Sequence, residues 1–341
     1  MGHGFDGSTT QACREACRVG SGDLGSAYRA PSGDELRQHR MATLGVIKVR
    51  RRNLLAAGLL SLGLLAGCGS SPTVVPFSLG TAHRDLTYCD SQKLDLYTPR
   101  SPAVRPLPVA IYVHGGGMTA GDKSDLSPVI LDALASAGYA VVSIDYRLAP
   151  QSRFPTQIED VKCAIRYMRA QAVTYGLDRG KVFAFGTSVG GQLVALAALT
   201  GPHSRWDIGA YSGQPSNLAA VADIFGPANL TEPASGFSPS GIEQVFGRND
   251  HRDLVLASPT HYVAPNSPPI LLVQGVDDTK VLESQSLELY QDLQAAGDQS
   301  QLVLVQHMGH MFTQVGTKPI DPTLRQIAND IVRFFDSVQN S

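Results

Sequence analysis

The stretch GTSVGGQL, residues 186–193, places a serine between glycines directly after the apolar run KVFAF. A strand that turns at once into a helix would project the hydroxyl of Ser188 at the edge of a sheet, where it could act as a nucleophile. A serine hydroxyl is a weak nucleophile, so it needs a base to take its proton and an acid to orient that base. The motif alone also fits an ordinary glycine-rich loop, so other residues must decide.

Candidates for the acid and the base follow two later apolar runs. In LLVQGVDDTKV, Asp277 and Asp278 come after a predicted strand, and we favour Asp278 as the acid. Either carboxylate could instead cap the next helix or line a turn. In VLVQHMGHMF, His307 ends a predicted strand, and we favour His310 in the following loop as the base. The chain order Ser, Asp, His is the order that one class of sheet-based hydrolases requires.

A glycine-rich segment, HGGGMTAGDK at residues 114–123, follows the third predicted strand. Attack on an ester carbonyl creates an oxyanion, which backbone N–H groups can stabilise where glycines let the backbone come close. We expect Gly116 and Gly117 to supply two donors and Val189 the third. A plain flexible loop and a phosphate-binding turn are the other interpretations. No G-K-[ST] sequence follows and the glycines lack Rossmann spacing, which argues against a nucleotide site.

Short apolar runs alternate with amphipathic runs and predict the elements that position these residues. The expected strands cover residues 84–89, 93–99, 108–115, 139–146, 181–187, 219–226, 268–275 and 301–307, and the expected helices cover 127–138, 157–172, 188–200, 282–297 and 324–338. Several strands are continuously apolar, as in a parallel sheet covered on both faces. The pattern predicts one α/β domain with a doubly wound, mostly parallel sheet of eight strands and an antiparallel first pair. Residues 229–264 predict a small cap-like insertion after the sixth strand.

The first part of the chain has a different composition. Residues 1–40 are rich in Gly, Ser and Arg without an apolar period, which predicts a disordered leader or an incorrectly assigned start. From Met41, a basic segment, a short apolar run and the ending LAGC at Cys68 resemble a bacterial lipoprotein signal. We therefore expect translation to start at Met41 rather than Met1, and residues 41–67 to be removed.

This interpretation gives the mature chain an anchor and a location. Acylated Cys68 would become the new N-terminus and tether the protein to a bacterial membrane, facing an extracytoplasmic space. Residues 68–80 would then be a linker, and residues 81–341 would form the catalytic domain. The sequence does not set the oligomeric state.

Charge and cysteine content limit the classes of partner and compartment. The formal net charge of −2 over 341 residues, without a basic stripe, argues against nucleic acid as a partner. Of the five cysteines, Cys89 and Cys163 lie in the expected catalytic domain. They could pair in an oxidising compartment. We favour the alternative that both are small, unpaired, buried side chains.

Six stretches of the sequence resemble the α/β-hydrolase superfamily and, within it, the bacterial feruloyl/acetyl-esterase group close to the hormone-sensitive-lipase-like carboxylesterases. They are HGGGMTAGDK, IDYRLAPQSRFPTQIEDVKCAIRYMR, YGLDRGKVFAFGTSVGGQL, SPTHYV, PPILLVQGVDDTKV and HMGHMF. The resemblance runs from about Leu94 to the C-terminal helix. It implies Ser188 as nucleophile, Asp278 as acid, His310 as base, and Gly116, Gly117 and Val189 as the oxyanion hole.

The same resemblance implies structural supports and shows two departures. His114 and the run Asp145-Tyr146-Arg147 are implied as supports of the site. Such proteins often have an aromatic residue where this chain has Met118, and usually Ala where it has Val189. Both departures change the walls beside the reacting ester, although backbone donors do not depend on side-chain identity.

These observations predict a serine carboxylesterase that acts on small or carbohydrate-linked esters, with acetyl, feruloyl or short-chain acyl groups, through an acyl-enzyme. The expected reaction requires no metal or organic cofactor. A serine peptidase of the prolyl-oligopeptidase kind is one alternative, but such enzymes usually add a β-propeller, for which the chain is too short. A non-catalytic surface lipoprotein on the same fold is the other, although such relatives usually lack a triad member.

Overall fold

The computed structural model describes residues 79–102, 105–248 and 250–339. The predicted leader, signal peptide and acylated Cys68 lie outside these residues, as does nearly all of the predicted linker. Within the described part of the chain, no helix has both the length and the apolar character needed to cross a bilayer.

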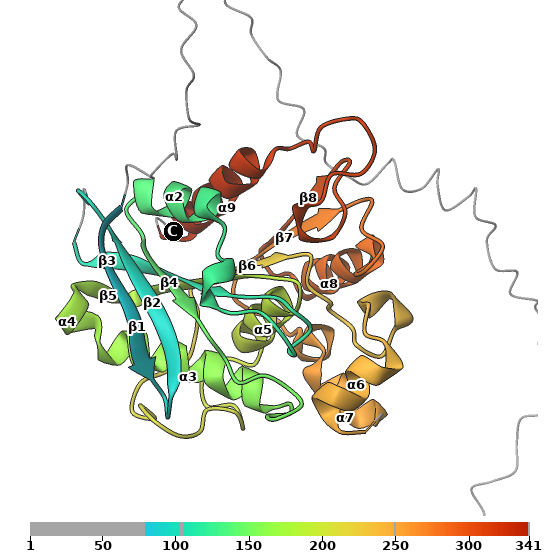
Figure 1. Ribbon diagram of the computed structural model, residues 1–341, viewed down its shortest axis with the longest axis horizontal. Coiled ribbons are helices and arrows are strands. Elements are labelled where there is room, and N and C mark those ends of the chain that lie inside the picture. Colours follow the sequence, from blue (N-terminus) through green and yellow to red (C-terminus); the bar gives the residue numbers. More distant parts are fainter. Residues whose placement is uncertain (1–78, 103–104, 249, 340–341) are drawn as a thin grey trace, which may run out of the picture. The chain divides into compact units, whose positions relative to one another are not determined.

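All eight expected strands are present in the described residues, and they form one sheet (Figure 1). They are β1 (Leu79–Tyr88), β2 (Gln92–Pro99), β3 (Leu107–Val113), β4 (Ala140–Ile144), β5 (Leu177–Thr187), β6 (Val221–Ile224), β7 (Ile270–Gly275) and β8 (Ser300–Val305). Their order across the sheet is β1-β2-β4-β3-β5-β6-β7-β8. Strands β3 to β8 run parallel, whereas β2 is antiparallel to both β1 and β4. The predicted fold class is therefore confirmed.

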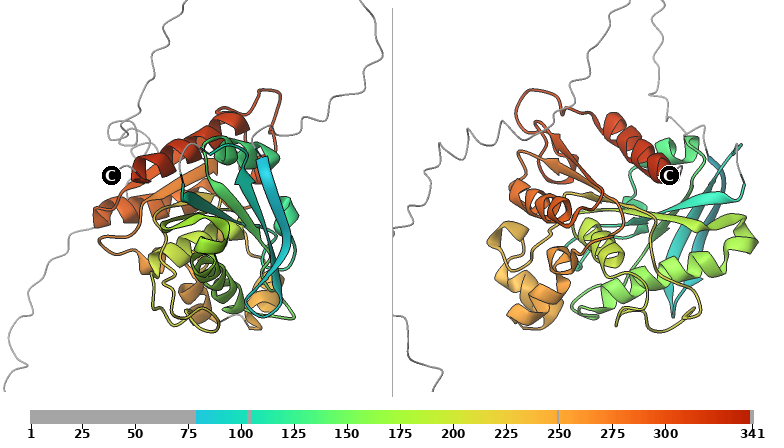
Figure 2. Two further views of the ribbon diagram at one scale, coloured as in Figure 1. Left: turned by 90° about the vertical axis from the view of Figure 1, so that its left-hand side faces the viewer. Right: turned by 180° about the vertical axis from the view of Figure 1, so that it is seen from behind.

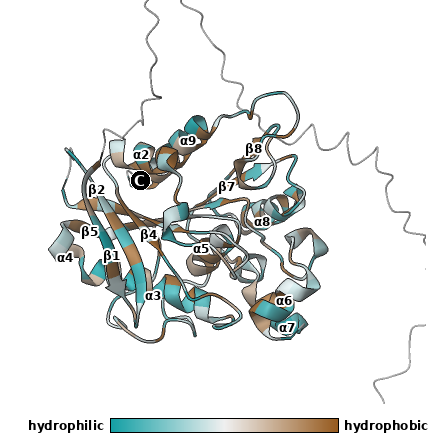
Figure 3. Cartoon of the chain, viewed as in Figure 1, coloured by the Kyte–Doolittle hydropathy of each residue, from teal (hydrophilic) through white to brown (hydrophobic). Residues whose placement is uncertain are grey.

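Helices cover both faces of this sheet (Figure 2). One face carries α2 (Pro128–Ser136) and α9 (Leu324–Gln339), and the other carries α3 (Thr156–Ala170), the short α4 (Ala172–Tyr175), α5 (Val189–Leu199) and α8 (Glu283–Ala296). The central strands are buried on both sides, because successive side chains point to opposite faces. In β3, for example, Ile111 packs into one core and Tyr112 into the other. Figure 3 shows the resulting hydrophobic runs along strands such as β4.

The insertion after β6 is more regular than its sequence suggests. It contains α6 (Pro239–Phe246) and α7 (His251–Ala257), flanked by the short 3₁₀ turns η2 (Pro233–Ser235) and η3 (Pro259–Tyr262). Pro and Ser residues begin a helix here, since Ser238 caps α6 and Pro239 is its first residue. The insertion packs on the domain through Phe246, whose ring centre lies 5.4 Å from that of Phe154.

A disulfide joins Cys89, just after β1, to Cys163 in α3. Our expectation of two unpaired side chains is therefore wrong. The two residues are 74 positions apart, so no local pattern shows that the fold brings their Cα atoms within 6.3 Å. A link that closes a loop of this length stabilises the domain mainly by restricting the unfolded chain.

Asp223 in β6 is a buried carboxylic acid beneath the first turn of α5. Its Oδ1 accepts a hydrogen bond from the Gly226 N–H at 2.8 Å, while its Oδ2 has no partner among the described residues. The packing is close, since a Cβ atom on Gly191 would come within 2.0 Å of Oδ1. Burial raises the pKa of Asp223 to about 7, because the charged form loses its hydration.

This raised pKa predicts that Asp223→Asn stabilises the protein more at high pH than at low pH. Between pH 3.8, the ordinary pKa of this carboxyl group, and about pH 7, the folded protein holds a proton that the unfolded chain has lost. The wild-type free energy of unfolding therefore falls as pH rises through this window, whereas a neutral amide has no such cost. From about pH 5 to about pH 8, we expect the stability of the variant relative to the wild type to rise by about 3 kcal/mol. Thermal or urea denaturation at both pH values measures the free energy of unfolding of the two proteins. A difference between them that is the same at both pH values would contradict the raised pKa of Asp223.

Candidate active site

Ser188 occupies the sharp turn between β5 and α5. Its φ of 54° and ψ of −128° lie in a region that is unfavourable for residues with a Cβ atom. The neighbouring glycines make the turn possible by close contact. A Cβ atom on Gly186 would lie 2.3 Å from the Gly190 backbone, and one on Gly190 would lie 2.1 Å from the Val113 carbonyl oxygen. The glycines of G-T-S-V-G therefore let the helix, the turn and β3 pack directly against one another.

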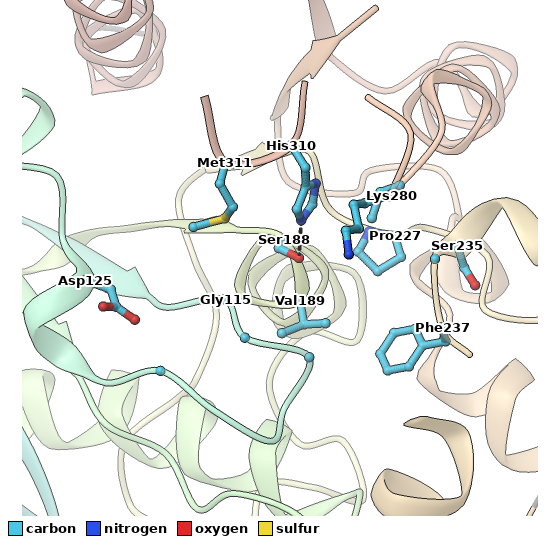
Figure 4. A pocket seen from close by; sticks show the side chains of 15 residues that line it. Gly115, Asp125, Ser188, Val189, Pro227, Ser235, Phe237, Lys280, His310 and Met311 are labelled. Carbon is cyan, nitrogen blue, oxygen red and sulfur yellow. Dashed lines mark hydrogen bonds between the residues drawn. The ribbon is translucent and has the colours of Figure 1, made fainter. Parts of the chain in front are cut away.

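The structure brings Ser188, His310 and Asp278 into one hydrogen-bonded chain. The His310 Nε2 atom lies 3.0 Å from the Ser188 Oγ atom (Figure 4), and His310 Nδ1 lies 2.8 Å from Asp278 Oδ2. Because the carboxylate accepts from Nδ1–H, the Nε2 lone pair faces the serine hydroxyl. The other carboxylate oxygen, Asp278 Oδ1, accepts from the backbone N–H groups of Lys280 at 2.8 Å and Val281 at 3.1 Å. Both oxygens of this buried carboxylate are therefore held by hydrogen bonds.

The alternative residues that the sequence left open, Asp277 and His307, lie together elsewhere. Asp277 Oδ2 is 4.0 Å from His307 Nδ1, and their side chains are 41% and 34% exposed. Neither makes a hydrogen bond to Ser188 among the described residues. The buried carboxylate and the imidazole next to the serine are those of Asp278 and His310.

Aromatic packing holds the imidazole in place, a feature that the sequence analysis missed. The ring of Phe225, just after β6, lies 5.0 Å from the His310 ring and packs edge-on against Phe312. His310, Met311 and Phe312 form the 3₁₀ turn η4 (His310–Phe312), in which both following residues have positive φ. The Thr313 hydroxyl donates to the His310 carbonyl at 2.6 Å. Phe225 has a positive φ of 47°, so the chain leaves the strand at this residue. The apolar run predicts instead that the strand continues through Phe225.

Three backbone N–H groups near Ser188 are left without acceptors among the described residues: those of Gly116, Gly117 and Val189. Gly116 and Gly117 have φ values of 94° and 64°, which glycine adopts at little cost. A Cβ atom on Gly116 would also lie 2.1 Å from the Ala120 carbonyl oxygen. Val189 begins α5, so its N–H has no partner in the helix and lies at the positive end of the helix dipole. All three residues line the same pocket as Ser188.

His114 and Tyr146 support this glycine loop from below. Their rings stack at 4.1 Å with an angle of 9° between the planes. The Tyr146 hydroxyl donates to the carbonyl oxygens of His114 and Gly115, both at 3.1 Å. Burial lowers the pKa of the His114 imidazole, because it disfavours the charged form of the ring. The loop therefore rests on an aromatic stack and on the hydrogen bonds of the Tyr146 hydroxyl.

The two neighbours of Tyr146 are also tied into the structure. The Asp145 carboxylate accepts from the Lys123 N–H at 2.8 Å, and its carbonyl accepts from the Tyr88 hydroxyl. Arg147 makes a two-pronged ion pair with Asp160 in α3, with its shortest contact at 2.5 Å. These contacts connect the loop after β4 to the loop after β3 and to α3.

A pocket of about 420 Å³ opens over Ser188 (Figure 4). Its apolar side chains are Val189, Pro227, Phe237, Val281 and Met311, and its polar or charged ones besides the triad are Asp125, Ser235 and Lys280. Ser235, Gly236 and Phe237 come from the insertion after β6, which therefore forms one wall, as the predicted cap-like role requires. No group of three or more His, Cys, Asp or Glu residues in the described part of the chain is arranged to hold a metal ion.

Comparison with known proteins shows the family and the enzyme class of the chain. The model of the BD-FAE family matches residues 94–293, more than half of the chain. Esterase LipC of Mycobacterium tuberculosis is 29% identical over 84% of this chain and 78% of its own length, and the ethyl acetate hydrolase of Pseudomonas putida is 27% identical over 75% and 81%. A solved truncated carbohydrate esterase from gut microbiota superposes with a TM-score of 0.68 at 26% identity, over 78% of this chain and 99% of that one. The chain therefore belongs to the BD-FAE family, and it is a carboxylic ester hydrolase with the α/β-hydrolase fold.

Proposed function

We propose that the protein is a serine carboxylesterase that hydrolyses small or carbohydrate-linked esters, with acetyl, feruloyl or short-chain acyl groups, through an acyl-enzyme on Ser188. The observation that carries the proposal is the hydrogen-bonded chain from Ser188 through His310 to the buried Asp278 carboxylate, beside three unpaired backbone donors. In this arrangement each residue has a chemical role that its contacts support.

In the first half-reaction, His310 Nε2 takes the proton of the Ser188 hydroxyl while Oγ bonds to the carbonyl carbon of the ester. Asp278 stabilises the imidazolium that forms and keeps its orientation. The carbonyl oxygen gains a negative charge, which the N–H groups of Gly116, Gly117 and Val189 face. Such a donor contributes about 3 kcal/mol to stabilising the transition state. The C–O bond to the alcohol then breaks, and His310 returns the proton to the leaving oxygen.

In the second half-reaction, water takes the place of the alcohol. His310 removes a proton from this water, whose oxygen attacks the acyl carbon, and the same backbone donors stabilise the second oxyanion. The bond to Ser188 Oγ breaks, the carboxylic acid leaves, and the proton on His310 restores the serine hydroxyl. The chain's own residues supply every proton transfer in this cycle.

The pocket supports a substrate larger than an acetyl group alone. Its volume of about 420 Å³ lies in the range of pockets that hold small organic ligands. Its mixed lining can contact apolar acyl groups and polar alcohol groups alike. The similarity to a carbohydrate esterase and to an ethyl acetate hydrolase supports both sugar-linked and simple alkyl esters as candidates.

One prediction of this mechanism concerns the nucleophile. Ser188→Ala should lower kcat/KM for p-nitrophenyl acetate by at least about 10⁴-fold, because no other group can form the acyl-enzyme. Initial-rate kinetics measure the loss. Ser91→Ala, in the exposed turn between β1 and β2, is the matched control and should keep full activity. An unaltered thermal denaturation profile for Ser188→Ala would show that the fold is intact, and retained turnover in that folded variant would reject the assignment.

Another prediction separates the two adjacent carboxylates. Asp278→Asn keeps the side-chain shape but removes the charge that stabilises the imidazolium, so kcat should fall by about 10⁴-fold. Asp277→Asn removes an exposed charge that contacts His307 instead, and it should change kcat by less than about threefold. Steady-state kinetics of the pair decide the matter. A greater loss in Asp277→Asn would show that Asp277, rather than Asp278, is the acid of the triad.

We also propose that the mature protein is anchored to a bacterial membrane by a lipid on Cys68 and faces an extracytoplasmic space. Cys68 lies outside the described residues, and the proposal is supported by the order of basic segment, apolar run and LAGC in the sequence. The disulfide between Cys89 and Cys163 adds support, because such bonds persist in oxidising compartments.

Mass spectrometry of the mature N-terminus, purified from the membrane fraction of an expressing bacterium, tests this proposal. We expect a chain that begins at Cys68 and carries a diacylglycerol group, and we expect Cys68→Ser to stay unprocessed because no acceptor thiol remains. A mature chain that starts before residue 68 and carries no diacylglycerol would refute the anchor.

A further inference from the structure

Lys280 places an ammonium group at the wall of the catalytic pocket. We propose that it binds a carboxylate carried by the ester substrate, and so makes the enzyme prefer esters with an anionic group close to the scissile bond. The inference rests on the proposed function, because it names a substrate class for the same site.

The backbone of Lys280 is held rigidly by the contacts that also hold the triad acid. Its N–H donates to Asp278 Oδ1 at 2.8 Å, and its carbonyl packs against Gly236, where a Cβ atom would come within 2.4 Å. The next two residues are fixed as well, since Gln274 donates to the Val281 carbonyl and the Leu282 N–H donates to Ala234. The side chain therefore starts from a defined point, and in Figure 4 it extends toward the pocket beside Pro227.

The charge of Lys280 has no ion-pair partner among the described residues. The two acidic residues that precede it in the same loop have other partners. Asp278 is occupied by His310 and by two backbone N–H groups, and Asp277 faces His307. The ammonium group, which lies beside Pro227 in Figure 4, is therefore available to an anion of the substrate.

The pocket has opposite charges on its two sides. Asp125 lines it away from Lys280 (Figure 4), and its carboxylate already accepts from the Asp122 N–H at 3.2 Å as part of a helix cap. An anionic substrate group is repelled from the Asp125 side and attracted to the Lys280 side. Both side chains are exposed to solvent, so this difference favours one side of the pocket by a modest amount.

The substrate class is therefore an ester that carries a carboxylate on either its acyl half or its alcohol half. A monoester of a dicarboxylic acid has the charge on the acyl half, and an ester of a hydroxy acid has it on the alcohol half. The chemistry that Lys280 recognises is the same in both, and the test below has one arm for each.

The experiment compares kcat/KM for anionic and neutral esters in matched pairs. The acyl arm uses p-nitrophenyl hemiglutarate against p-nitrophenyl hexanoate, and the alcohol arm uses 4-acetoxybenzoate against 4-acetoxybenzamide. In at least one arm, Lys280→Met should lower the anionic-to-neutral ratio by about two- to fivefold relative to the wild type, as expected for a solvent-exposed charge pair. Lys280→Arg should keep the ratio, and Lys280→Glu should lower it further. The arm in which the ratio falls identifies the half of the substrate that carries the carboxylate.

The exposed Lys318 provides the matched control, and Lys318→Met should leave both ratios unchanged. An unchanged ratio in both arms for Lys280→Met, or an equal loss on the charged and the neutral ester, would overturn the inference while leaving the esterase proposal standing. A wild-type enzyme that hydrolyses none of the four esters would overturn the proposed function itself, and the inference with it. Using the ratio as the readout separates charge recognition from a general loss of activity.

Discussion

The buried carboxylate of Asp278 is the constraint on which the rest of the site depends. A carboxylate removed from water is costly unless hydrogen bonds replace its hydration. Here three donors do so: the imidazole of His310 and the backbone N–H groups of Lys280 and Val281. The same bonds set the tautomer of His310, aim its Nε2 atom at Ser188 and fix the loop that carries Lys280. One satisfied charge therefore organises both the chemistry and one wall of the pocket.

The parallel sheet explains how residues far apart in the chain come to this carboxylate. The glycine loop follows β3, Ser188 follows β5, Phe225 follows β6, Asp278 follows β7 and His310 follows β8. In parallel strands all these carboxyl ends lie at one edge of the sheet, so their loops converge there. The strained turn at Ser188 is stabilised because the glycines around it pack directly on β3 and α5.

The features that the sequence predicted are those with a repeating or local physical cause. Short apolar runs identified all eight strands, and the runs of several central strands are nearly continuous because those strands are buried on both faces. The motif order placed Ser188, Asp278 and His310 on strand ends that the fold brings together. Residues that depend on tertiary contact could not be identified in this way. The pairing of Cys89 with Cys163 depends on how β1 and α3 meet.

The same limit explains the other omissions. The helices α6 and α7 begin at Pro and Ser or Asp residues that, without a known packing surface, indicate a loop as well as a cap. Phe225 is one more apolar residue at the end of an apolar run, and its contact with His310 appears only in three dimensions. Lys280 is one more charged residue in a polar loop until the pocket shows which way it faces.

The central claim is that Ser188 is the nucleophile and that the fold activates it. Treatment of the wild-type enzyme with a fluorophosphonate, followed by peptide mapping by mass spectrometry, measures this directly. We predict one covalent adduct, on the Ser188 side chain, whose formation is strongly slowed in His310→Ala because the hydroxyl then has no base. An adduct on another residue, or no adduct on an enzyme that still hydrolyses esters, would contradict the account.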